Sequence, residues 1–248
     1  MTDTDLTGMT KTMGIGTRIA ATLAGLAVVG AVVGGGVWFA GPTIAGHVIH
    51  DYLVTNPEVL NEAMDALQRK QAKAQLAGVR QSVETPFPGA VLGNPNGTVT
   101  LVEFTDYACG YCRRSLPDVA QLLAKNPDLR IVVRELPIIS QHSAAAARMA
   151  LAAAEQGKYH PFHDAMFAAG QLDPESIEAA ARQAGLDMER ARKVAASPVV
   201  EQELSRNVDV AGRLGFSGTP SWIAGDRMIS GAVGFEQLSQ AVNEARGS

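Results

Sequence analysis

Cysteine is scarce in this chain, which has 248 residues and two cysteines. A closed structural zinc site normally takes four Cys or His ligands, but the sequence has neither a second cysteine pair nor histidines clustered at zinc-finger spacing. The two cysteines present, Cys109 and Cys112, form a C-x-x-C, a spacing at which a disulfide can close and reopen. The pair therefore favours dithiol redox chemistry over zinc binding.

An excess of positive charge is also missing. The chain has 21 Lys and Arg against 25 Asp and Glu, for a formal net charge of -4. Because a nucleic-acid-binding protein normally carries a basic surface, nucleic acid is not an expected partner. The hydrophobic fraction of 46% is ordinary for a folded protein, which argues against a disordered chain.

Charged residues are absent from Ile19 to Ala40, a stretch long enough to match the ~20 residues of a membrane-spanning helix. Lys11 and Arg18 precede it, and the next Lys or Arg is Arg69, which favours a cytoplasmic N-terminus. We therefore predict a cytoplasmic tail at 1–18, a transmembrane anchor at 19–41 and an exported remainder.

The alternative is a cleaved signal peptide, for which Thr43-Ile44-Ala45 is an acceptable cleavage site. In either case the cysteines reach an oxidising compartment, where a C-x-x-C can act as a working disulfide.

Residues 47–85 are expected to form a helical stalk. Asn56-Pro57-Glu58 is a helix start, with an N-cap residue, a proline at the first helical position and an acid near the positive end of the helix dipole. The helix should run to about Gly78. Apolar residues recur every seven positions along it: Leu53, Leu60, Leu67 and Ala74. This repeat predicts either a short oligomerisation seam or a spacer docked on its own domain.

A second domain is predicted at 86–248. Residues 99–104 are typical of a buried strand, residues 112–123 have helical spacing ended by Asn126-Pro127, and residues 129–136 form another apolar strand. A strand, a helix and a strand in this order predict a βαβ unit with a parallel pair.

The stretch from about 141 to 212 is rich in alanine and predicts about four short helices, inserted as a lid or subdomain. Residues 221–230 then predict a β-hairpin with a tight turn at Gly225-Asp226. A last helix should contain Phe235 and Val242. The late strands can complete the sheet begun before the helical insertion.

The position of the cysteines assigns a role to each. A cysteine at a helix N-terminus has its thiolate stabilised by free backbone amides and the helix dipole. Cys109 should therefore be the exposed nucleophile, and Cys112, one turn further in, the buried residue that resolves the mixed disulfide. Gly110 and Tyr111 carry no charge, so the residues between the cysteines do not indicate whether the reduction potential of the pair is high or low.

Glu103 is the candidate for moving the proton of Cys112. It stands between Val102 and Phe104 in an otherwise apolar strand, where an unpaired charge would be unfavourable and the pKa of a carboxyl group would be displaced. The alternative is that Glu103 faces solvent at a strand edge.

Four separated motifs resemble the DsbA-like branch of the thioredoxin superfamily: residues 104–112 (FTDYACGYC), 134–137 (RELP), 162–167 (FHDAMF) and 218–222 (GTPSW). The resemblance implies an α/β thioredoxin fold with an inserted helical subdomain, and thiol–disulfide exchange on exported proteins. It implies a cis Pro220 against the active-site disulfide, with the preceding residue, Thr219, in contact with the substrate. Pro220, Gly110 and Tyr111 are also expected to bind the substrate. Thioredoxin-like proteins also carry a carboxylate six positions before the first cysteine, where Glu103 stands.

Residues 56–60 are further similar to the suppressor-of-copper-sensitivity C type of these proteins. In that group the N-terminal helical region mediates oligomerisation in some members, and isomerase activity goes with it. The expected partners are reduced or misoxidised exported proteins, a membrane redox partner and further copies of the chain. No cofactor is expected besides the Cys109–Cys112 disulfide.

We expect a single-pass protein of the bacterial inner membrane with a periplasmic catalytic domain, acting as a disulfide oxidase or isomerase. One alternative is a reductase fed by a membrane electron donor. Another is a non-enzymatic module that binds Cu(I) through Cys109 and Cys112, because thiolates favour that ion. His160 and His163 are read as one exposed and one packed histidine of a helix rather than as metal ligands.

Overall fold

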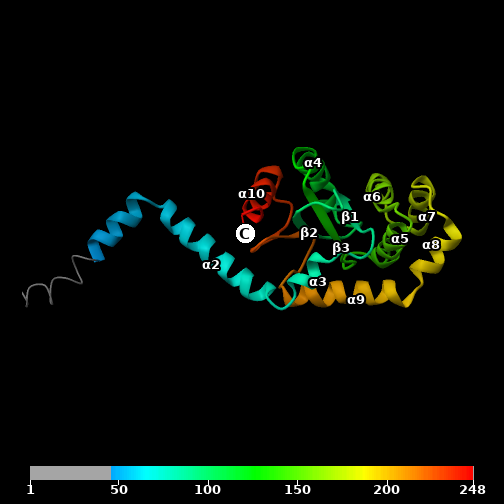
Figure 1. Ribbon diagram of the computed structural model, residues 1–248, viewed down its shortest axis with the longest axis horizontal. Helices are drawn as coiled ribbons and strands as arrows, with labels where there is room; N and C mark the ends of the chain where they lie inside the picture. The colour runs from blue at the N-terminus through cyan, green and yellow to red at the C-terminus, as the bar shows by residue number, and fades with distance from the viewer. Residues whose placement is uncertain (1–45, 248) are drawn as a thin grey trace, which may run out of the picture. The chain divides into compact units, whose positions relative to one another are not determined.

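The computed structural model describes residues 46–247 of the chain (Figure 1). The predicted tail at 1–18 and membrane anchor at 19–41 lie outside these residues. Among residues 46–247, no helix is both long and apolar enough to cross a membrane. The chain divides into two compact units, residues 1–64 and 65–248, with the boundary inside helix α2 (Glu58–Leu76).

A mixed five-stranded sheet forms the centre of the second unit. Its strands are β1 (Val91–Gly93), β2 (Val99–Thr105), β3 (Leu129–Glu135), β4 (Ser221–Ala224) and β5 (Arg227–Ser230), in the spatial order β1-β3-β2-β4-β5. Strands β2 and β3 are parallel and the other neighbours are antiparallel. The predicted parallel pair is thus confirmed, with α4 (Gly110–Lys125) as its connecting helix, and so is the predicted β4–β5 hairpin.

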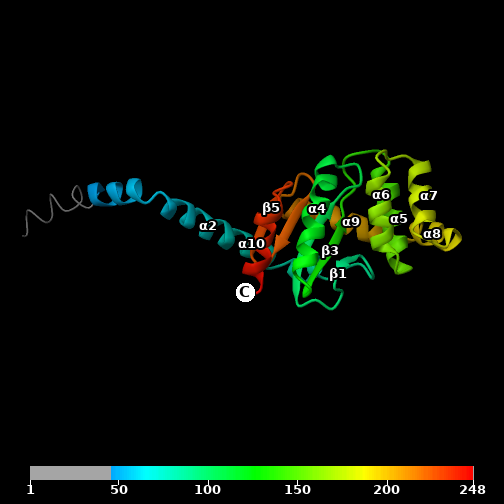
Figure 2. The ribbon, with the colours of Figure 1, turned by 90° about the horizontal axis from the view of Figure 1, so that it is seen from above.

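Helices cover both faces of the sheet (Figures 1 and 2). Five of them stand between β3 and β4, where about four were expected: α5 (Ser143–Glu155), α6 (Tyr159–Ala168), α7 (Pro174–Gln183), α8 (Met188–Ala195) and α9 (Pro198–Arg213). Two more are α3 (Arg80–Glu84), before the sheet, and α10 (Phe235–Ala245), which packs beside α4.

Alternation along β2 assigns its side chains to two cores. Leu101 belongs to the core that contains Cys112 on α4, whereas Val102 and Phe104 belong to the core on the opposite face. Glu103, which has the same parity as Leu101, therefore lies on the α4 face. The sheet thus places this carboxylate beneath the helix that carries the cysteines.

Arg134 of β3 ties several segments together on the opposite face. Its guanidinium lies 2.6 Å from Glu203 of α9, and both side chains are at least 95% buried. It also donates to the carbonyl oxygens of Ser82, Val83 and Thr85. This cation therefore joins the segment after α2 to the sheet and to α9.

Replacing Arg134 by Ala should lower the free energy of unfolding by about 3 kcal/mol, because Glu203 keeps only its contact with the half-exposed Arg206 and three backbone carbonyl oxygens lose their donor. Arg148→Ala is the matched control, since Arg148 pairs with Glu201 at the surface, where the two side chains are 37% and 63% exposed. We expect a loss of about 1 kcal/mol or less for the control. Equal losses in urea unfolding of the two variants would contradict the structural role of Arg134.

The first unit is helical where it is described. Residues 46–55 form one helix and α2 begins at Glu58. Asn56 was predicted to cap the amides of α2, but its side chain donates to the carbonyl oxygen of Tyr52 at 2.9 Å, at the end of the preceding helix. The helix break is in the predicted place, and both the backbone amide and the side chain of Asn56 donate to the Tyr52 carbonyl there.

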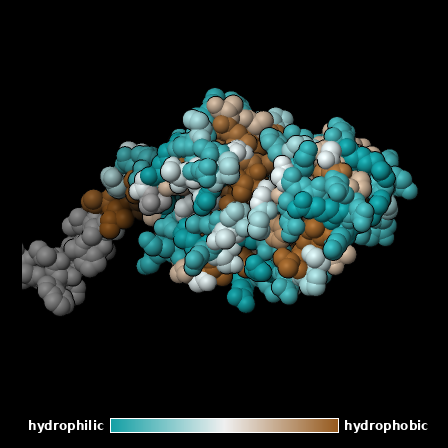
Figure 3. Space-filling model, turned by 45° about the vertical axis from the view of Figure 1, so that its right-hand side comes forward, coloured by the Kyte–Doolittle hydropathy of each residue, from teal (hydrophilic) through white to brown (hydrophobic). Residues whose placement is uncertain are grey.

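Large apolar side chains are exposed along this unit. Six of them are at least 50% exposed: Val48, Ile49, Tyr52, Val54, Leu60 and Met64. In Figure 3 hydrophobic residues gather at the N-terminal end of the described chain. Exposure of this many apolar residues in one short segment is typical of an interaction surface.

The last turns of α2, which belong to the second unit, are docked. Leu76 is fully buried with Val102 and Phe104 in the core opposite α4. Asp65 lies 3.1 Å from Arg227 of β5. The predicted stalk therefore combines apolar residues that are exposed with a C-terminal end that packs on its own domain.

Candidate active site

The N-terminus of α4 carries the first cysteine. Cys109 is the N-cap residue, with an extended backbone (φ -82°, ψ 114°), and its sulfur accepts a hydrogen bond from the amide of Cys112 at 3.4 Å. The first amides of a helix have no partner within the helix and mark the positive end of its dipole. This position can stabilise a thiolate on Cys109.

Both cysteines are free thiols and both are buried. Cys109 is 4% exposed and Cys112 is 1% exposed. The prediction of an exposed Cys109 is therefore wrong. The thiol of Cys109 donates to the carbonyl oxygen of Thr219 at 3.1 Å, so a segment 110 positions later in the chain covers the sulfur.

The covering segment contains the predicted cis proline. The Thr219–Pro220 peptide bond is cis, and the hydroxyl-bearing side chain of Thr219 is largely buried. Strand β4 follows at once and pairs with β2, which ends just before the cysteines. The sheet therefore brings Thr219 and Pro220 to the start of α4.

Gly110 and Tyr111 lie at the surface beside Cys109. The side chain of Tyr111 is 58% exposed, and a Cβ atom on Gly110 would meet nothing within 4 Å. The two residues that separate the cysteines thus leave open space above the first turn of α4.

Glu103 is buried on the α4 face of the sheet. Strand β2 is central, with β3 and β4 on its two sides, so the alternative of Glu103 at an exposed strand edge is wrong. Burial raises the pKa of Glu103 to about 8. Burial also raises the pKa of Cys112 far above its ordinary value, and the negative charge of Glu103 raises it further. Cys112 is therefore a thiol at neutral pH and needs a base to react.

Asp106 is a site residue that sequence reasoning missed. Its buried carboxylate accepts hydrogen bonds from the amide of Ala108, the hydroxyl of Ser143 and the amides of Ile138 and Ile139, at 2.7–3.0 Å. It thereby joins the turn before Cys109 to the loop after β3. The local signal was present, because an Asp that bonds the amide two residues later is a common turn former.

A second buried polar cluster was also missed. The hydroxyls of Tyr107 and Tyr159 donate to one oxygen of Glu135, at 3.2 Å and 2.8 Å, and the Tyr107 hydroxyl lies 3.3 Å from Nδ1 of His163. Burial raises the pKa of Glu135 to about 8 and lowers that of His163 to about 3. The RELP and FHDAMF motifs, which entered only through the resemblance, therefore meet at Tyr107.

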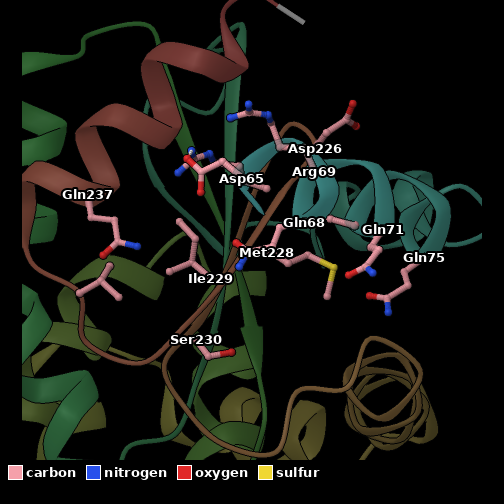
Figure 4. Close-up of a pocket in the computed structure, with 13 residues that line it drawn as sticks. Asp65, Gln68, Arg69, Gln71, Gln75, Asp226, Met228, Ile229, Ser230 and Gln237 are labelled. Carbon is pink, nitrogen blue, oxygen red and sulfur yellow. Dashed lines mark hydrogen bonds and ion pairs between the residues drawn. The ribbon is translucent and has the colours of Figure 1, made fainter. Parts of the chain in front are cut away.

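A cavity of about 370 Å³ lies beside the docked end of α2, away from the cysteines (Figure 4). Its amide side chains come from α2 (Gln68, Gln71 and Gln75) and from α10 (Gln237), and β5 supplies the rest of one wall. None of the predicted site residues lines it. The chemistry predicted for the cysteines is therefore located elsewhere, at the start of α4.

Comparison with known proteins decides the family. A family model described as a DSBA-like thioredoxin domain matches residues 100–243, which is more than half of the chain. The chain belongs to this family. The thioredoxin-type fold predicted for this DSBA-like chain is thus confirmed. Residues 46–74 also match the model of the copper resistance protein ScsC N-terminal domain.

Solved structures agree with this assignment. A thioredoxin-like oxidoreductase from Silicibacter pomeroyi is 41% identical, with a TM-score of 0.64, and the match covers 68% of this chain and 98% of that one. Proteus mirabilis ScsC in a transitional conformation is 28% identical, with a TM-score of 0.64, over 84% of this chain and 98% of that one. The DSBA-like chain is therefore similar in structure to a thioredoxin-like oxidoreductase and, over a larger share of its length, to ScsC.

A curated relative is much longer. The Na(+)/H(+) antiporter NhaA 3 of Salinispora tropica is 35% identical over 158 residues, which is 62% of this chain and 24% of the relative. The DSBA-like chain thus spans about a quarter of the length of the curated relatives that it matches.

Proposed function

We propose that this protein is a thiol–disulfide oxidoreductase that acts on exported proteins, as a disulfide oxidase, an isomerase or both. One observation carries the proposal: the Cys109 sulfur stands at the start of α4, 3.1 Å from the carbonyl oxygen that precedes the cis proline. Cys109 is the nucleophile, Cys112 resolves the mixed disulfide, and the reactive unit is their disulfide without a further cofactor.

The oxidation step follows from this arrangement. A substrate thiolate attacks the Cys109 sulfur of the enzyme disulfide, the Cys109–Cys112 bond breaks, and Cys112 leaves as a thiolate. The proton that Cys112 needs comes from Glu103, which burial keeps protonated up to about pH 8. A second substrate thiolate then attacks the substrate sulfur of the mixed disulfide and releases Cys109. The enzyme gains two electrons, which a membrane redox partner must remove.

Isomerisation begins from the reduced enzyme. The Cys109 thiolate attacks a wrong disulfide in the substrate, and a substrate thiol is released. Either another substrate thiol or Cys112 then attacks the mixed disulfide, and in the second case Glu103 in its ionised form accepts the Cys112 proton. Thr219, Gly110 and Tyr111 are proposed to contact the bound segment, and the support is that the Thr219 carbonyl meets the Cys109 sulfur and that Tyr111 is exposed beside it.

Oxidase and isomerase are separated by one pair of measurements. An oxidase should have a strongly oxidising Cys109–Cys112 couple and should oxidise a reduced substrate protein. An isomerase should recover activity from a scrambled substrate without net oxidation. The reduction potential, measured against glutathione, and the scrambled-substrate assay would distinguish them. Absence of both activities would contradict the proposal.

We also propose that the chain is exported, which agrees with the same assignment. The apolar stretch at 19–41 is proposed to anchor the chain in the inner membrane, with the catalytic domain in the periplasm. In the antiporter relatives a segment similar to this chain forms part of a protein named as a membrane transporter. An oxidising compartment outside the membrane would allow the disulfide to persist.

The stalk at 47–85 is proposed to hold copies of the chain together. Leu60 and Leu67, seven positions apart, are 50% and 53% exposed. Replacing Leu60 by Asp should place a charge in the seam and convert the oligomer into monomers. Sedimentation of the detergent-solubilised full chain measures the mass of the assembly and so distinguishes oligomer from monomer.

Asn61→Asp is the matched control for the stalk, because Asn61 is exposed on the same helix but outside the seven-residue repeat. It should leave the mass unchanged. If the Leu60→Asp variant has the same mass as the wild-type protein, the exposed seam is not an oligomerisation site.

A further inference from the structure

Glu103 has a second carboxylate as a neighbour on its face of the sheet. In the parallel pairing of β2 with β3, Glu103 stands opposite Val133 and Thr105 stands opposite Glu135. Residues two apart on a strand share a face, and Val133 belongs to the same core as Cys112. Glu135 and Glu103 are therefore diagonal neighbours on the α4 face.

Glu135 is held from two other segments. Both tyrosine hydroxyls, from Tyr107 before the active-site turn and from Tyr159 of α6, donate to Oε1. Its Oε2 atom and Nε2 of His163 are buried without a hydrogen-bond partner among the described residues. Buried polar atoms are rarely left in this state, and catalytic sites are one place where they occur. Glu135 therefore requires an explanation beyond stability.

The groups around the two acids carry little positive charge. Besides Cys112, the titratable groups that face them are Asp106, Tyr107, Tyr159 and His163. Burial raises the pKa values of both tyrosines well above the ordinary value and makes His163 neutral at neutral pH.

The two acids also affect each other. Burial raises the pKa of Glu135, the hydrogen bonds from Tyr159 and Tyr107 lower it, and the negative charges of Asp106 and Glu103 raise it. Two neighbouring acids of this kind lose their protons in two separate steps, because ionisation of one disfavours ionisation of the other.

We propose that Glu135 is a positioning residue for the thiol chemistry: as the second buried carboxyl group beside Glu103, it sets the pH at which Glu103 can accept the proton of Cys112. The inference rests on the proposed function. In the step concerned, Cys112 attacks the mixed disulfide, the Cys112 proton moves to the Glu103 carboxylate, and Glu135 neither gains nor loses a proton. Tyr159 and Tyr107 act through Glu135, because the hydrogen bonds that they donate to it stabilise its ionised form.

The test is the pH dependence of the step that Cys112 performs. A mixed disulfide between Cys109 and a cysteine-containing peptide is prepared in acid, and peptide release is followed from about pH 6 to about pH 10 in the full-length protein. The wild-type rate should rise over two ionisations. In Glu135→Gln only Glu103 can ionise. The release rate of this variant should therefore rise in a single step, which is complete about one pH unit below the end of the wild-type rise.

Tyr159→Phe provides a second variant with a different expected result. Because the Tyr159 hydrogen bond lowers the pKa of Glu135, its loss should move the upper ionisation to higher pH and separate the two steps further. Glu236→Gln, at an exposed position of α10, is the matched control and should keep the wild-type profile. If Glu135→Gln does not fold, Tyr159→Phe decides in the same way.

A purely structural Glu135 would reduce thermal stability and leave the shape and position of the pH profile unchanged. That result in Glu135→Gln, or in Tyr159→Phe, overturns the inference while the proposed function stands. If the wild-type protein forms no mixed disulfide through Cys109, both the proposed function and the inference are overturned.

Discussion

Replacing Cys109 by Ser should lower thiol–disulfide exchange by about a thousandfold or more, as expected for loss of a nucleophile. A serine hydroxyl at the start of α4 cannot form a disulfide, and Cys112 cannot take its place. Cys112 is 1% exposed, and burial and the charge of Glu103 raise its pKa far above that of a free thiol. The measurement is oxidation of a reduced substrate protein, together with recovery of a scrambled one.

Cys112→Ser is the matched control for this prediction. It retains the nucleophile and lacks only the resolving thiol, so it should still form the mixed disulfide and accumulate it. Wild-type turnover in Cys109→Ser would show that the nucleophile is assigned to the wrong residue.

Replacing Glu103 by Gln should slow release of the mixed disulfide by about a hundredfold, the usual range for loss of one acid–base group. Burial raises the pKa of Glu103 from 4.5 to about 8. The base form therefore appears as the pH rises through about 8, and the wild-type release rate should rise over the same range. In Glu103→Gln this rise in rate should disappear.

The pH dependence of the free energy of unfolding gives an independent check on Glu103, and the raised pKa of Glu103 determines its direction. Between pH 4.5 and about 8 the folded protein retains a proton on Glu103 that the unfolded chain releases, so stability falls as the pH rises through this window. Glu103→Gln removes this loss. The variant should therefore gain stability relative to the wild type as the pH rises. Unchanged release kinetics and an unchanged pH dependence of unfolding would together remove Glu103 from the mechanism.

The central part of the fold could be predicted because its signals are local. The apolar run of β2 stops just before the cysteines, and the helical spacing after them predicts α4, so Cys109 falls at a helix start. Strand β1 was missed, since it has only three residues and lies in a stretch crowded with glycine and proline. Short edge strands form from pairing with a neighbour, here β3, rather than from their own sequence.

The environment of the site could be predicted less well, because distant segments build it. Burial of Cys109 comes from the Thr219 carbonyl, which no local pattern links to the cysteines. The Glu135 cluster joins β3, the active-site turn and α6. The available signal for Glu135 was an acid at the end of a strand, which is weaker than the acid inside an apolar strand that identified Glu103.

The stalk shows a limit of periodicity. A seven-residue apolar repeat predicts one buried face but does not identify what covers it. The structure buries Leu76 in the domain core and leaves Leu60 and Leu67 exposed. Ion pairs such as Asp65–Arg227 fix the docked end, and their partners lie more than 150 positions apart in the sequence.

The central claim, that Cys109 is the nucleophile of a thiol–disulfide exchange enzyme, is tested most directly by mass spectrometry of the two single-cysteine variants. Each reduced variant is mixed with a peptide disulfide, and the adduct is located by peptide mapping as it forms. The account predicts rapid formation of one peptide adduct on Cys109 in Cys112→Ser, and an adduct that forms far more slowly on Cys112 in Cys109→Ser. Equal rates in the two variants, or no adduct on Cys109, would contradict it.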